Sequence, residues 1–135
     1  MYRKDHILTE IEKLTRALAR LLGLKATNET EEAQQFVNDL LKNDFGLPDD
    51  IYNLGDDEFK QLIRQKAYGA GKLDILAQLL YHDATSPLKH PAEAQSLLQK
   101  TLILFDVLEQ DYRTQSFENI TLRSKIHQLL KQYHA

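Results

Sequence analysis

The feature that most constrains this chain is a helical spacing of apolar residues that recurs along almost its whole length. In the stretch ILTEIEKLTRALARLL, residues 7–22, apolar side chains follow one another in steps of four and three, at Ile7, Ile11, Leu14, Leu18 and Leu21. Such steps place side chains on one face of an α-helix. No stretch alternates between apolar and polar residues for long enough to predict a strand. The pattern therefore predicts an all-α protein.

Turn and cap residues divide the pattern into about six helices. Gly23 is placed to end the first helix, and Asn28 with Glu31 three residues later is typical of a capping box that starts the second. Further boundaries are predicted at Gly46 and Pro48, at Asp56, at Gly69-Ala70-Gly71, at Pro91 and near Ser116. Because the connections are short, we expect antiparallel hairpins in a single helical domain, residues 1–135, built as a bundle or short solenoid.

The fifth helix, from about Pro91 to Tyr112, stands apart from the others by its composition. It is apolar over much of its circumference, with Leu97, Leu104 and Phe105 among its large side chains. A helix with so wide an apolar surface must be covered on several sides. We therefore expect it at the centre of the core.

Composition excludes several classes of protein. The 135 residues include no cysteine, which rules out disulfides, thiolate metal sites and a cysteine nucleophile. No run of about 18 apolar residues is present, so no membrane span is predicted. Charged residues interrupt the apolar stripe near the N-terminus, so a secretory signal is not predicted either. These observations favour the cytoplasm.

Charge is distributed unevenly along the chain, although the net charge is only −3. Residues 1–25 hold six basic residues and three acidic ones, whereas residues 26–59 hold ten acidic residues and one lysine. Residues 113–135 are again basic, with four basic residues and one acidic. We expect the basic ends and the acidic middle to attract each other, within one chain or between two.

Residues 57–95 carry a family resemblance. The stretches DEFKQLIRQKAYGAGKLDILAQLLYHDA and SPLKHPAEAQ form a helix, a glycine-containing turn, a second helix and a turn marked by proline. This order resembles one tetratricopeptide repeat, although the tryptophan–glycine–tyrosine set of the family is missing and no second copy follows at a fixed period. The resemblance implies packed helix hairpins and protein binding, but it does not identify a groove. For a groove, we name Tyr68, Lys72 and Tyr81 near the glycine turn as candidates. The opening KDHILTEIEKLTRALARLLGLK is similar to small bacterial helical proteins, which implies a bacterial origin.

The candidates for chemistry do not assemble into a recognised motif. Tyr81-His82-Asp83 is the densest polar cluster, but neighbours on a helix point apart, and His82 is better explained by the dipole of a helix C-terminus. Paired acids such as Asp49-Asp50 lack the spacing of a calcium loop and suit helix N-termini. The glycines at 69–71 follow a helix and lack both phosphate-binding patterns. We therefore expect no catalytic residue, no cofactor and no metal.

The first helix offers the best candidates for binding. Its apolar seam is explained by packing on the rest of the chain or by pairing with a second copy, as in a homodimer. A basic face, Lys13, Arg16 and Arg20, lies beside the seam and suits nucleic acid or an anionic membrane surface. The acidic middle opposes any polyanion. The leading hypothesis is a non-catalytic protein-interaction or adaptor module whose partner is another protein or itself, and nucleic-acid binding is the alternative.

Overall fold

The computed structural model describes the backbone of residues 2–134 and the side chains of residues 8–133. This part of the chain forms six α-helices and no strand, which confirms the all-α prediction. The helices are α1 (Tyr2–Ala26), α2 (Thr30–Asp39), α3 (Asp56–Lys66), α4 (Ala70–Ala84), α5 (Pro91–Tyr112) and α6 (Phe117–His134). A π-helical turn, η1 (Leu40–Asp44), extends α2, and a 3₁₀ turn, η2 (Ile51–Asn53), precedes α3.

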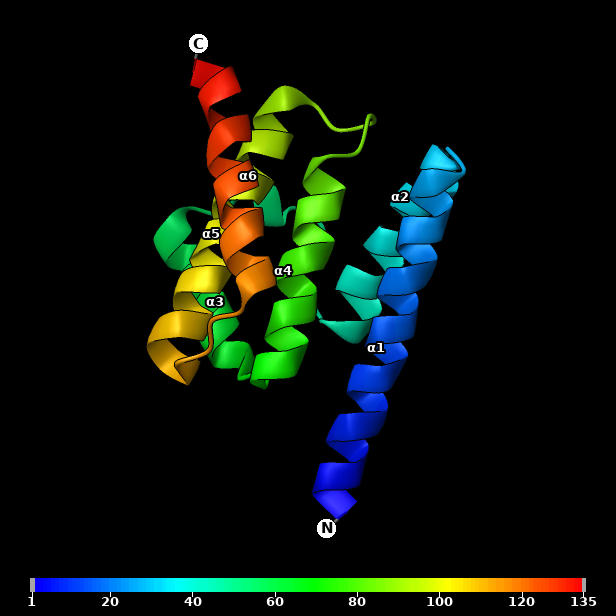
Figure 1. Cartoon of the computed structure of the whole chain (residues 1–135), viewed down its shortest axis with the longest axis vertical. Coiled ribbons are helices and arrows are strands. Elements are labelled where there is room, and N and C mark those ends of the chain that lie inside the picture. The colour runs from blue at the N-terminus through cyan, green and yellow to red at the C-terminus, as the bar shows by residue number, and fades with distance from the viewer. Residues whose placement is uncertain (1, 135) are drawn as a thin grey trace.

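The helices pack around a central hairpin formed by α4 and α5 (Figure 1). The α1–α2 hairpin lies against α4 on one side, while α3 and α6 pack on α5 on the other. Sequential helices α1–α2, α4–α5 and α5–α6 run antiparallel, as the short connections predict. The main contact of α3 is with α5.

The core is one cluster of buried side chains to which every helix contributes. Helix α5 supplies many of its members, including Leu104, Phe105 and Leu108, each no more than 1% exposed. Helix α5 contacts α3, α4, α6 and η2, so the apolar surface that its sequence shows is covered from several sides. The prediction that this helix forms the centre of the core is confirmed.

The end of α1 differs from the prediction. The helix continues through Gly23 to Ala26, and Asn28 adopts a left-handed conformation with φ 61°. The backbone N–H of Glu29 then donates to the carbonyl of Leu24 at 2.9 Å, and that of Asn28 donates to Lys25 at 3.2 Å. This is a Schellman termination, in which Asn28 follows the end of α1. Helix α2 begins at Thr30 without a side-chain cap, so the predicted capping box is wrong.

The glycine run before α4 also differs from the prediction. Gly69 caps the helix and Ala70 begins it, so Gly71 lies in the first helical turn instead of in a loop. A Cβ atom on Gly71 would lie 2.8 Å from Cδ1 of Ile11. The absence of a side chain at Gly71 therefore lets α1 approach α4 closely.

Candidate protein-binding surface

The predicted seam of α1 packs largely on the core of its own chain. Leu14 and Leu21 are each 1% exposed, and Ile11 and Leu18 are partly buried against the same core. The side chain of Ile7 lies outside the described residues. A partner of α1 would therefore contact the residues beside this seam instead of Leu14 and Leu21.

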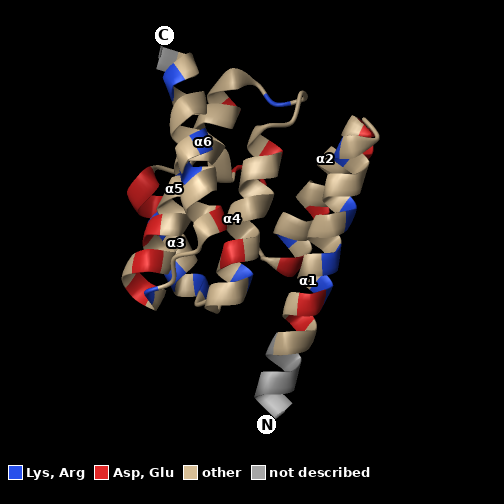
Figure 2. Cartoon of the chain, viewed as in Figure 1, with Lys and Arg blue, Asp and Glu red and all other residues tan. Residues whose placement is uncertain are grey.

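The predicted basic face of α1 is partly occupied by contacts within the chain. The Nζ atom of Lys13 lies 3.8 Å from a carboxylate oxygen of Asp44, and the guanidinium of Arg20 lies 5.0 Å from the ring centroid of Phe36. These contacts join α1 to α2 and η1, and the pair of Lys13 with Asp44 is an instance of the predicted attraction between the basic end and the acidic middle. Figure 2 shows basic residues along this side of α1. Arg16 is exposed.

Tyr68 and Lys72, two of the predicted groove residues, contact each other. Both form contacts within the chain at one end of the bundle. The hydroxyl of Tyr68 donates to the backbone carbonyl of Phe45, and burial raises the pKa of Tyr68 to about 12. The ammonium of Lys72 lies 5.1 Å from the ring centroid of Tyr68 and 5.3 Å from that of Phe45, and it pairs with Glu10. These contacts tie α1, α4 and the loop after η1 together.

Tyr81 lies more than two turns further along α4, beside a different surface. It is half-buried and meets the ring of His82 edge to face, with centroids 5.3 Å apart. From Asp74 onward, the partly exposed residues of α4 fall on one stripe of the helix: Asp74, Gln78, Tyr81 and His82. This stripe is the part of α4 that its neighbours leave open.

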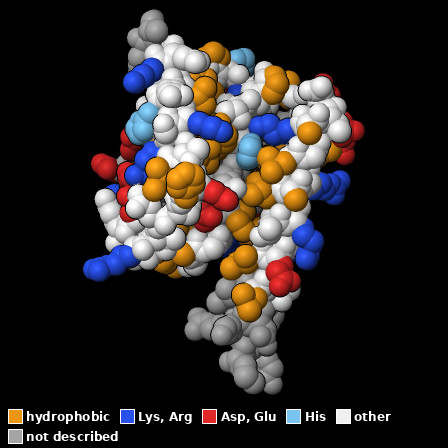
Figure 3. Space-filling model, viewed as in Figure 1, with side chains coloured by type: hydrophobic (Ala, Val, Ile, Leu, Met, Phe, Trp, Pro, Cys, Tyr) orange, Lys and Arg blue, Asp and Glu red, His pale blue; other side chains and the backbone are white. Residues whose placement is uncertain are grey.

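A cleft of about 430 Å³ lies over this stripe, between α4 and α6; we call it the α4 groove. It is lined by Gln78, Tyr81 and His82 from α4 and by Phe117, Glu118, Asn119, Thr121, Leu122 and Lys125 from α6. Phe117, at the rim, is 83% exposed. Figure 3 shows hydrophobic side chains on both sides of the hollow, over α6 on the left and over α1 on the right.

A second, smaller cavity of about 230 Å³ lies where α1, α2 and the end of α4 meet. In it the Nζ atom of Lys25 donates to Nδ1 of His82 at 3.2 Å, to the carbonyl of His82 at 3.2 Å and to Oγ1 of Thr85 at 3.1 Å. Burial, together with the charge of Lys25, lowers the pKa of His82 to about 4. Burial also lowers the pKa of Lys25, against the opposite effect of Asp83. The ring nitrogen that would act as a base is thus already engaged by an ammonium.

Asp83 does not orient His82. Its Oδ1 atom accepts from Nε2 of Gln34 at 2.9 Å and lies 3.2 Å from Nζ of Lys89. Asp83 is 5% exposed, so this is a buried ion pair, and it fixes the connection between α4 and α5 to α2. The sequence analysis missed this group because Gln34, Asp83 and Lys89 come from three separate segments.

The lowered pKa of His82 makes stability depend on pH. The unfolded chain binds a proton on His82 below about pH 6.5, whereas the folded chain does so only near pH 4, so stability is lost as the pH falls through this window. We expect native protein to lose about 1–2 kcal/mol more than the His82→Gln variant between pH 7 and pH 4.5, allowing for partial solvent screening. Urea unfolding at the two pH values measures the difference. His127→Gln, at an exposed position of α6, is the control and should behave like the native chain; equal pH dependence in all three proteins would contradict the assignment.

Two further properties limit the candidate sites. Among the residues whose side chains are described, no group of three or more His, Asp or Glu is placed to hold a metal ion. Among the described helices, none is long and apolar enough to cross a lipid bilayer.

Comparison with protein families, with curated proteins and with solved structures found no match to this chain. The candidate surface therefore rests on its own geometry.

Proposed function

We propose that the protein is a non-catalytic protein-binding module, working in the cytoplasm, whose binding surface is the α4 groove. The observation that carries the proposal is the exposure of Phe117, 83%, at the rim of a cleft with Tyr81 in its wall. An aromatic side chain gains much free energy when a partner covers it, and aromatic residues are enriched where proteins meet. A half-open cleft between two helices suits the apolar face of a third helix.

The polar residues of the groove support protein binding over small-molecule chemistry. Glu118 and Lys125 line it with opposite charges, and Gln78 lines it from the open stripe of α4. An apolar centre with a mixed polar rim is typical of protein interfaces. The acidic net charge and the internal contacts of Lys13 and Arg20 leave nucleic-acid binding as the less supported alternative.

Site-specific photo-crosslinking tests the proposal. A photoreactive phenylalanine analogue at Phe117 is expected to yield a discrete protein adduct in cells of the organism that encodes the chain. The same analogue at Leu88, which is 49% exposed in the connection between α4 and α5, is the control and should yield none. Absence of an adduct at Phe117, or equal adducts at both positions, would overturn the proposal.

A further inference from the structure

Helix α1 carries a second apolar stripe, beside the one that packs on the core. We call it the outer seam; it consists of Leu8, Thr15, Ala19, Leu22 and Ala26. All five residues are exposed, and the two large ones, Leu8 and Leu22, are 50% and 44% exposed. The steps of seven, four, three and four keep the outer seam on one edge of the helix. This edge is a helix surface of mostly apolar residues that the described part of the chain leaves exposed.

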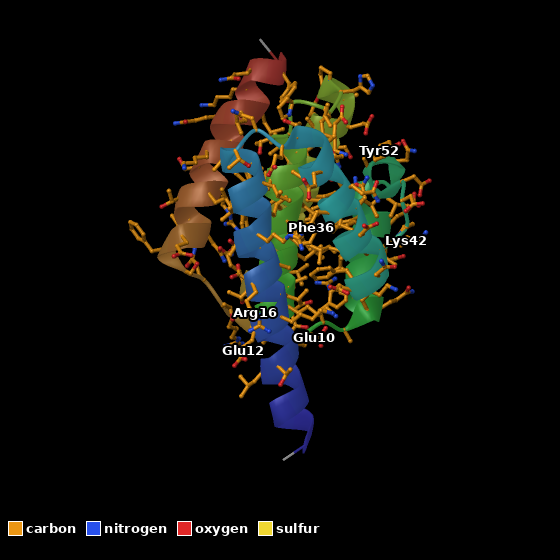
Figure 4. All side chains as sticks on the ribbon, turned by 90° about the vertical axis from the view of Figure 1, so that its right-hand side faces the viewer. Glu10, Glu12, Arg16, Phe36, Lys42 and Tyr52 are labelled. Carbon is orange, nitrogen blue, oxygen red and sulfur yellow. The ribbon has the colours of Figure 1, made fainter. Side chains whose placement is uncertain are left out.

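The outer seam lies on the side of α1 that faces the α4 groove. The opposite edge of α1 holds the contacts with α2, including the stacking of Arg20 on Phe36. Figure 4 shows Phe36 between α1 and α2, whereas Glu12 and Arg16 lie on the side of α1 toward α6. Glu12 and Arg16 flank the outer seam and are exposed, and neither forms an ion pair within the described part of the chain.

We propose that the occupant of this face is α1 of a second copy of the chain, in a two-fold symmetric dimer whose outer seams pack antiparallel over the α4 grooves. The inference rests on the proposed function and names its partner. A two-fold interface uses one patch twice, so the patch must complement itself. A helix edge whose large apolar residues are spaced equally on both sides of its centre meets that requirement when two copies run antiparallel.

The spacing along α1 makes the outer seam complementary to itself when two copies run antiparallel. Thr15 is seven residues from both Leu8 and Leu22, so centring the pair on Thr15 places Leu8 of each copy opposite Leu22 of the other. The small side chains of Thr15 and Ala19 then lie at the crossing point, where close approach of two helices needs them.

Charge complementarity supports the same arrangement. With the pair centred on Thr15, Glu12 of one copy and Arg16 of the other differ in level by two residues, about 3 Å along the axis. This offset is within reach of the two long side chains. The dimer thus forms two pairs of opposite charges, from residues that have no ion-pair partner among the described side chains of one chain.

The test is the dimer dissociation constant of the full chain, from sedimentation equilibrium at micromolar concentrations. We expect a dimer that Leu22→Glu weakens by about 30-fold or more, because the charge replaces one of the two large apolar side chains of the outer seam and faces Leu8 of the other copy. Leu88→Glu, at a position of similar exposure outside the surface, is the matched control and should leave the constant unchanged. Both variants alter exposed side chains, and their thermal unfolding should match that of the native chain.

Charge exchange tests the antiparallel register itself. Glu12→Arg alone and Arg16→Glu alone should each weaken the dimer by about 5- to 10-fold, and the double variant should restore it to within about twofold. A native chain that is monomeric at these concentrations, a dimer that Leu22→Glu leaves intact, or a double variant as weak as the single ones would overturn the inference. A monomer whose Phe117 analogue crosslinks a different protein would overturn the dimer and leave the proposed function standing.

Discussion

Phe105→Ala is expected to lower the free energy of unfolding by about 3–5 kcal/mol, because it removes a large side chain from a site that cannot close around the gap. Phe105 is 1% exposed at the middle of α5, where several helices meet. Its ring also lies 5.8 Å from the guanidinium of Arg123 on α6, which pairs with Glu109 at 3.0 Å. The substitution should therefore also loosen α6, one wall of the α4 groove. Urea unfolding followed by circular dichroism measures the loss.

The matched control is Phe117→Ala, the same replacement at an exposed position. Because Phe117 is 83% exposed, its removal should change the free energy of unfolding by no more than about 0.5 kcal/mol. It should nevertheless weaken partner binding, which separates the role of the groove from that of the core. A similar loss of stability in the two variants would show that α6 does not pack as described.

Asp83→Ala is expected to cost about 3–5 kcal/mol of unfolding free energy, because it leaves a buried ammonium without its counter-charge. The side chain of Lys89 is 13% exposed, and Gln34 would lose its acceptor as well. An acid in the last turn of a helix is unfavourable by itself, since the C-terminus of the helix dipole is negative. The contacts with Lys89 and Gln34 offset that cost in the native protein. The measurement is again urea unfolding, at neutral pH.

Two comparisons isolate the contribution of the buried pair. The double variant Asp83→Ala with Lys89→Met carries no unpaired charge and should recover about 1–3 kcal/mol relative to the sum of the single effects. Arg64→Ala breaks the exposed pair of Arg64 with Asp111, joined at 3.0 Å, and should have a much smaller effect than Asp83→Ala. A loss at Asp83 no greater than that at Arg64 would contradict a buried role.

Only part of the candidate protein-binding surface could be predicted from the sequence. The first helix was selected correctly as an amphipathic element, but periodicity cannot show which of two adjacent stripes faces the core, since both fit a helix. Leu22 is one residue from Leu21, yet Leu21 is 1% exposed and Leu22 44%. Phe117 lies off the inner stripe of α6, which Leu122 and Ile126 define. The position of Phe117 outside this helical repeat was the one signal in the sequence that could have identified it as an exposed aromatic residue.

The sequence by itself determined the all-α class, the number of helices and most of their boundaries, because these depend on local spacing and on residues such as Pro91 that restrict the backbone. It also determined that α5 is central, since only a covered helix tolerates so much apolar surface. The tertiary structure decided the rest. Asn28 ends α1 because its left-handed conformation closes two hydrogen bonds to that helix. Asp83 meets Gln34 of α2 and Lys89 of the connection to α5, and Phe117 lines the same cleft as Tyr81, only because the tertiary structure brings separate segments together, and no local pattern encodes such distances.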